Sequence, residues 1–196
     1  MMKTMRLGAL TAAAAVALVL GGCFGGGAPA ELLTLRADQT RPVDAPRTAA
    51  PGEAITVVEP TVPASLATTR VPVYVAPQTI QYLRDAFWSD DPSELFRSVV
   101  AETIAAGGRV VLDPGQYSHD PGIRLTGQLL LFGLDADRME AVVQYDAVLT
   151  RGQAAVTTNR FEARVPVTAA DAALVAPALN QAANQVAAQV AAWMTR

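Results

Sequence analysis

The sequence predicts a single α+β domain in which a mainly antiparallel sheet, ending in a three-strand meander, packs against at least two helices. Residues 123–165 contain three strand-like runs joined by short turns, which is typical of an antiparallel meander. Two other segments, 91–108 and 168–193, repeat apolar residues at helical spacing. The chain downstream of residue 30 is long enough to bury one core, so we expect one domain over residues 31–196.

The first 22 residues differ in composition from the rest of the chain. The first six residues carry two positive charges, and Leu7–Leu20 is an uncharged run rich in Ala, Leu and Val. Two glycines then precede Cys23, the only cysteine of the sequence. A basic segment, a short apolar segment and small residues before a cleavage site are typical of a secretory signal peptide.

The four residues Leu20-Gly21-Gly22-Cys23 resemble a bacterial lipobox. This resemblance implies that the Cys23 thiol receives a diacylglycerol, that residues 1–22 are removed, and that the new amino terminus is acylated. Several acyl chains on one residue anchor a protein firmly, since each buried CH₂ contributes about 0.8 kcal/mol. The residue after the cysteine is Phe24, whereas the usual retention signal of the inner membrane is Asp, so the resemblance implies an outer-membrane location facing the periplasm.

An uncut signal anchor is the alternative for this segment. Its strongly apolar part is shorter than the roughly 20 residues that a membrane-spanning helix needs, and its second half is rich in glycine. We therefore expect a lipid-anchored protein in which residues 23–30 form a flexible tether. The chain from Cys23 onwards has 13 Arg, no Lys and 18 acidic residues, hence a charge of 13 − 18 = −5. This charge argues against nucleic acid or an anionic membrane surface as the electrostatic partner.

The first half of the domain shows β-branched runs interrupted by proline. We expect short strands at 31–36, 54–59, 65–75 and 79–88, with a Pro- and Thr-rich loop over 38–52. Pro72 lacks a backbone donor, so its strand should lie at an edge of the sheet or be irregular.

The clearest local signal is the helix that follows. Asp91 is a good N-cap, Pro92 suits the first helical position, and Glu94 completes the pattern of a capping box. Gly107 and Gly108 end the helix. A short strand at 109–112 and a loop over 113–122 should come next.

The meander should use strands at 123–134, 139–150 and 154–165. Its run Leu129–Leu134 is apolar on both faces, so the sheet should be covered on both sides there or meet a partner. Thr168 with Asp171 predicts a second capping box, which opens a long helix. We expect a buried stripe on this helix, formed by Val175, Leu179, Ala182 or Ala183, Val186, Val190 and Trp193. Pro177 should kink the helix or restart it.

Three stretches of the chain carry a family resemblance. They are the lipobox with "ELLTL" soon after it, the segment from Ile55 to Ile104, and the Ala-rich ending that closes with Trp193. In the middle stretch a strand with tyrosine ends in tryptophan and is followed by a helix, here through Tyr82, Trp88, Pro92 and Leu95. These features cover most of residues 31–194 and resemble the ABC-type transport auxiliary lipoproteins, the PqiC-like family.

The resemblance implies a non-catalytic subunit of a lipid transport system of the mammalian-cell-entry (MCE) type. In such systems an ATPase and a permease in the inner membrane work with an MCE protein that reaches across the periplasm. The lipoprotein docks or receives this conduit at the outer membrane, and phospholipid would be the cargo. The resemblance implies no cofactor apart from the covalent lipid on Cys23.

The residues themselves give little support to an enzyme. His119 is the only histidine, and its neighbour Ser118 is adjacent in sequence, which does not make a nucleophile–base pair. Asp135 and Asp137 lack the further oxygen ligands of a Ca²⁺ loop and are interpreted as turn residues. No glycine-rich loop of the P-loop type is present, so ATP hydrolysis would belong to another chain.

Two further functions stay open beside the transport subunit. One is a periplasmic carrier that binds lipid in a cavity between sheet and helices, and the other is a structural lipoprotein that assists another envelope assembly. Phe87 and Trp88 have two interpretations as well: they cap the core at the end of the sheet, or they form an exposed aromatic patch for a partner. A homo-oligomer is plausible, with no number of copies specified by the sequence.

Overall fold

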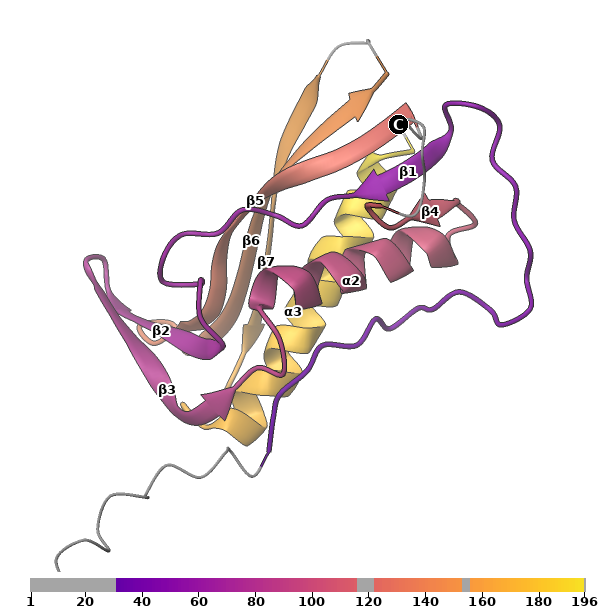
Figure 1. The fold of residues 1–196 in the computed structure, drawn as a ribbon. Coiled ribbons are helices and arrows are strands. Elements are labelled where there is room, and N and C mark those ends of the chain that lie inside the picture. Colours follow the sequence, from indigo (N-terminus) through magenta and orange to yellow (C-terminus); the bar gives the residue numbers. More distant parts are fainter. Residues whose placement is uncertain (1–30, 116–121, 153–155, 196) are drawn as a thin grey trace, which may run out of the picture. The chain divides into compact units, whose positions relative to one another are not determined.

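The computed structural model describes residues 31–115, 122–152 and 156–195, which form a single α+β domain of two helices and a seven-stranded mixed sheet (Figure 1). In chain order the elements are β1 (Ala54–Val57), β2 (Arg70–Ala76), β3 (Thr79–Phe87), α2 (Pro92–Ala106), β4 (Val111–Leu112), β5 (Gly122–Asp135), β6 (Glu140–Arg151), β7 (Thr157–Pro166) and α3 (Ala172–Trp193). The predicted fold class is confirmed.

The meander of β5, β6 and β7 is confirmed as the largest part of the sheet. β5 and β6 pair antiparallel from Ile123↔Arg151 to Asp135↔Glu140, and β7 pairs antiparallel along the other edge of β6. In β5 a register shift between Leu129 and Leu131 interrupts the pairing. The shift changes which residues of β5 face the core: Leu125 and Leu129 are buried before it, and Phe132 and Leu134 after it.

The second edge of β5 carries pairings that the sequence analysis did not anticipate. β1 pairs parallel with the start of β5, Thr61 bridges Gln128 in its middle, and β2 pairs parallel with its end. β4 pairs parallel with the outer side of β1, and β3 pairs antiparallel with β2. The sheet is therefore mixed, although its longest ladders are antiparallel.

Pro72 lies in an irregular strand, as predicted, but this strand is not an edge of the sheet. β2 lies between β3 and β5, and its register with β3 shifts between Arg70 and Pro72. Gly133 of β5 permits the close approach of β2, because a Cβ atom there would lie 2.3 Å from the carbonyl oxygen of Pro72. The irregularity thus accommodates a residue without a backbone donor inside the sheet.

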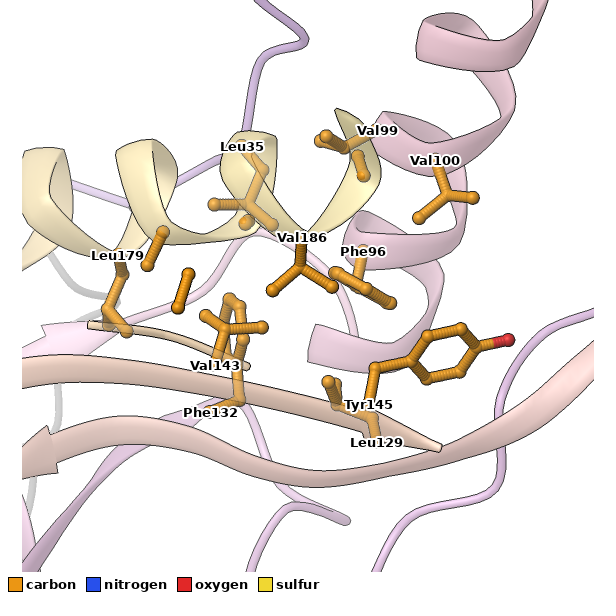
Figure 2. Close-up of a cluster of buried hydrophobic side chains, with 14 of the residues drawn as sticks. Leu35, Phe96, Val99, Val100, Leu129, Phe132, Val143, Tyr145, Leu179 and Val186 are labelled. Carbon is orange, nitrogen blue, oxygen red and sulfur yellow. The ribbon is translucent and has the colours of Figure 1, made fainter. Parts of the chain in front are cut away.

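Both helices cover one face of the sheet and bury the core against it (Figure 2). From α3, Leu179 and Val186 reach towards Phe132 and Val143 of the strands (Figure 2). From α2, Phe96 packs against Tyr145, with ring centroids 5.2 Å apart in an edge-to-face arrangement. The predicted apolar stripe of α3 is buried through Val175, Leu179, Ala182, Ala183, Val186 and Val190, whereas Trp193 is half-buried.

The helix caps differ from the predicted pattern. The Asp91 side chain makes no capping hydrogen bond. The reciprocal bond is missing as well, because the Glu94 carboxylate accepts from Arg97 Nε at 2.7 Å and the Asp91 backbone N donates to Asp90 Oδ1 at 2.8 Å. The predicted first capping box is therefore wrong, although α2 begins where expected. At α3 the N-cap is Asp171 itself, which accepts from the backbone N of Ala173 at 2.8 Å, so the helix begins later than a cap at Thr168 would place it.

Two further expectations are corrected. α3 continues through Pro177 without a restart, so of the two outcomes expected from this proline the restart is excluded. Residues 31–36 do not form a strand: only Leu33 makes a bridge, with Trp88. Side-chain amides of α3 bind the following backbone instead, and this excludes a regular ladder.

Candidate functional site

The candidate residues of the sequence analysis fall into two groups. Cys23, Ser118 and His119 lie outside the described residues. Phe87 and Trp88 lie where β3 leads into α2, and Asp135 ends β5. The Asp135 carboxylate accepts from Arg138 and Arg164 at the turn, in agreement with its interpretation as a turn residue.

Trp88 belongs to the core. Its side chain is 2% exposed, and its ring centroid lies 5.3 Å from that of Phe132. Its backbone N donates to Thr69 O at 2.7 Å, while its indole Nε1 has no hydrogen-bond partner among the described residues. Trp88 therefore packs in the core at the end of the sheet and does not form an exposed aromatic patch. Phe87 beside it is half-buried.

Residues 31–33 join the rest of the fold at this point. Leu33 N donates to Phe87 O at 2.7 Å, and Ser89 N donates to Leu33 O at 2.8 Å. Together with the start of α3, residues 31–33 and 87–89 are called the proximal end of the domain below. Two backbone hydrogen bonds thus join Leu33 to the residues on either side of the buried Trp88.

Two asparagines of α3 bind the next residues of the same segment. Arg36 N donates to Asn180 Oδ1 and Asp38 N donates to Asn184 Oδ1, both at 2.8 Å. Asn184 Nδ2 returns a bond to Arg36 O at 2.8 Å. Arg36 contacts Asn180, and Asp38 contacts Asn184 one turn later, so the segment runs in the same direction as α3. Residues 31–33 therefore lie beside the start of this helix, as Figure 1 shows.

The proximal end exposes two large apolar side chains. Leu32 is 54% exposed and Leu174, in the first turn of α3, is 45% exposed. The residues around Leu174 are mostly alanine, and Asp171 there is engaged as the N-cap. This end therefore presents a small apolar surface near residue 31, where the described chain begins.

Arginines from other segments complete the C-terminal ends of both helices. Neither helix has a basic residue in its last turn. Arg47 Nη1 donates to Ala105 O near the end of α2, and Arg151 Nη2 donates to Met194 O at 2.6 Å at the end of α3. Positive charge at these carbonyls is favourable because the C-terminal end of a helix carries partial negative charge. We call this part of the molecule, with loop 41–53, the distal end.

The distal end contains a surface hollow of about 800 Å³. One wall is the loop Arg41–Arg47, and the other is formed by Glu102, Arg109 and the residues 110–112. We call this feature the arginine hollow. The sequence analysis missed it: arginine is the only basic residue type of the domain, so single arginines in a loop gave no distinctive pattern, and only the fold brings Arg41, Arg47 and Arg109 together.

The face of the meander that points away from the helices carries a ladder of ion pairs. Arg164 donates to Glu162 at 2.6 Å and to Asp135 at 2.8 Å, and Arg160 makes two bonds of 2.6 Å to Asp146. Burial alone would raise the pKa of Asp135, but the bonds from Arg164 and Arg138 outweigh it and lower this pKa below its usual value. The hydrogen bond from Arg160 likewise lowers the pKa of Asp146. The charges of this face are thus mutually compensated.

Two negative findings apply to the described part of the chain. No helix within residues 31–115, 122–152 and 156–195 is long and apolar enough to cross a bilayer. Nor do these residues include three or more His, Cys, Asp or Glu side chains placed to hold a metal ion together.

Comparisons with known proteins found one matching family model and solved structures with a similar fold. The model of the family described as ABC-type transport auxiliary lipoprotein component matches residues 34–191. A solved structure of a protein from Xanthomonas campestris is similar with a TM-score of 0.66 at 20% identity, over 84% of this chain and 93% of the other. A second solved structure, of an uncharacterised protein, has a TM-score of 0.65 at 15% identity, over 84% and 99% of the two chains. A comparison with curated protein sequences gave no match.

Proposed function

Because the chain belongs to the ABC-type transport auxiliary lipoprotein family, we propose that it is a non-catalytic subunit of an envelope lipid transporter. Acyl chains on Cys23 anchor it in the outer membrane, facing the periplasm. The domain docks or receives the MCE-type protein that reaches it from the inner membrane, where the permease and the ATPase of the system reside. Phospholipid is the cargo.

The observation that carries this proposal is the separation of the domain into two ends. Glu31 follows Cys23 by eight residue steps (31 − 23), which can span at most about 28 Å. The proximal end is therefore restricted to the neighbourhood of the lipid anchor. α3 has 22 residues and, at 1.5 Å per residue, carries the chain about 33 Å from the proximal to the distal end. This geometry supports an adaptor whose distal end is held away from the membrane.

The packing of the core supports an adaptor over a lipid carrier. A carrier would need an apolar pocket between sheet and helices, yet side chains such as Phe132, Leu179 and Val186 occupy that space and are fully buried. The arginine hollow lies at the surface, and its lining mixes charged and apolar residues. The family and the packing together favour recognition of a protein partner.

A crosslinked pull-down of the full-length, tagged lipoprotein from native membranes tests the proposal. We expect an MCE-type protein together with its permease and ATPase, and a weaker yield with Cys23→Ala, which lacks the lipid attachment point. Recovery of other envelope machinery without any transporter component would refute the proposal. Copies of the chain that carry two different tags would report self-association in the same experiment.

A further inference from the structure

We propose that the arginine hollow binds an extended, acidic segment of a partner protein, which adds a strand to the free edge of β4. This inference goes beyond the proposed function because it concerns the chemistry of the segment, whichever envelope protein supplies it. It rests on three features of the hollow: an open sheet edge, two arginine side chains without a partner among the described residues, and apolar groups in the walls.

The open edge belongs to β4, the last strand on its side of the sheet. β4 pairs with β1 through Ile55↔Val111 and Thr56↔Leu112. The opposite edge of β4 faces the arginine hollow, and the loop over residues 41–47 passes outside it in a wide arc (Figure 1). An unpaired strand edge is a template for an added strand, and several peptide-binding domains bind extended segments in this way.

Two guanidinium groups at the hollow have no partner within the described residues. Arg47 is engaged by the carbonyl groups of Ala105 and Arg109. In contrast, no hydrogen bond or ion pair is formed by the side chains of Arg41 and Arg109 with any described residue. Other arginines of the domain do have carboxylate partners, namely Arg97, Arg138, Arg160 and Arg164. Arg41 and Arg109 are thus available to the carboxylates of a ligand, which guanidinium groups bind with two parallel hydrogen bonds.

Apolar groups in the same walls favour a polypeptide over an isolated anion. Pro42, Val43 and Pro46 line the loop side, where Val43 is 89% exposed, and Val111 and Leu112 on the opposite side are half-buried. An extended segment directs successive side chains to opposite sides, so acidic residues can meet the arginines while alternate apolar residues meet these walls. An anionic lipid headgroup would use the charges but not the strand edge. The volume of about 800 Å³ is also sufficient for a segment of several residues.

The experiment places a photoreactive amino acid at position 43 of the full-length chain in cells that naturally produce it. Illumination is followed by peptide sequencing of the adduct by mass spectrometry. Position 80 on β3, where Ile80 is also exposed, serves as the matched control position. A double charge reversal, Arg41→Glu with Arg109→Glu, is compared with Arg84→Glu and Arg124→Glu, which change the net charge equally at exposed sites outside the hollow.

We expect a position-43 adduct on a segment rich in Asp or Glu. The Arg41→Glu/Arg109→Glu pair should reduce its yield at least about tenfold, and the control pair should leave it unchanged. Circular dichroism of both double variants checks that the fold is retained. The inference is overturned if the adduct lies on a lipid, on a second copy of this chain or on a segment without acidic residues, if no adduct forms, or if its yield does not depend on the two arginines. An arginine-dependent acidic segment from a protein outside any transporter would sustain the inference and refute the proposed function.

Discussion

The proximal and distal ends of the domain use their side chains in opposite ways. At the proximal end Trp88 is buried, and Asp171 caps α3. The backbone N and O of Leu33 form hydrogen bonds with Phe87 and Ser89. At the distal end arginines lie at the surface, where Arg47 and Arg151 complete the helix ends. The proximal end is thus held together by backbone hydrogen bonds and buried packing, whereas arginine side chains join the segments of the distal end.

Replacement of Trp88 should have the largest effect on stability. We expect Trp88→Ala to lower the free energy of unfolding by about 3–5 kcal/mol, since the side chain is buried against Phe132. Urea unfolding followed through the fluorescence of Trp193 measures this change. Trp88→Phe should cost clearly less, because the indole Nε1 that it removes has no partner in the described structure. Similar losses of unfolding free energy in Trp88→Ala and Trp88→Phe would contradict this, because they would show that the indole Nε1 forms a stabilising hydrogen bond.

The two helix starts offer a matched pair of aspartates. Asp171→Ala should cost about 1 kcal/mol of unfolding free energy, because its carboxylate accepts from Ala173 N. Asp91→Ala should cost close to nothing, since the Asp91 side chain makes no capping bond. Chemical denaturation of both variants measures the difference, and equal losses would contradict the assignment of the caps.

The ion-pair ladder predicts sensitivity to acid. The folded-state pKa values of Asp135, Asp146 and Glu162 are lowered, so their contribution to stability is present above the unfolded pKa of about 4 and is lost as the pH falls through the folded pKa. Unfolding free energies measured between neutral and acidic pH should therefore decline below about pH 4. Arg164→Gln should make this decline shallower, whereas Arg84→Gln outside the ladder should not. If the unfolding free energy of Arg164→Gln declined with pH as steeply as that of the unmodified protein, Arg164 would be excluded as the cause of the acid sensitivity.

Charge reversal at the arginine hollow should have the smallest effect on stability. We expect the Arg41→Glu/Arg109→Glu pair to change the unfolding free energy by less than about 0.5 kcal/mol, because neither side chain has a partner in the described structure. Urea titration of the double variant beside the unmodified protein checks this. A loss of unfolding free energy comparable to that of Trp88→Ala would show that the two arginines stabilise the fold. The distal end would then not differ from the proximal end in this respect.

Local signals predicted α2 and the meander, because helix periodicity and short turns are properties of neighbouring residues. The caps show the limit of such patterns. Asp91 and Glu94 match a capping box in sequence, but the Glu94 carboxylate accepts from Arg97, one helical turn further on, and the Asp91 backbone N donates to Asp90. A competing side chain a few residues away is sufficient to change the cap without moving the helix.

The parallel pairings and the arginine hollow depend on residues far apart in the chain. β1 reaches β5 across more than sixty residues, through Ile55↔Ile123, and no local pattern specifies such a partner. The hollow needs the same long-range arrangement, which brings Arg41 and Arg109 to the same end. The burial of Trp88 likewise depends on Phe132 in a distant strand, so the residues next to Trp88 do not decide between a core position and an exposed patch.

Two labels on one helix test whether the proximal end faces the membrane. Leu174 and Ala192 are both exposed on α3, and 18 residues (192 − 174) at 1.5 Å each place them about 27 Å apart. A fluorophore is attached to Leu174→Cys or Ala192→Cys of the full-length lipoprotein in vesicles that contain an acceptor lipid. We expect strong energy transfer from position 174 and weak transfer from position 192. Equal transfer from both positions, or stronger transfer from position 192, would show that the distal end is not held away from the membrane.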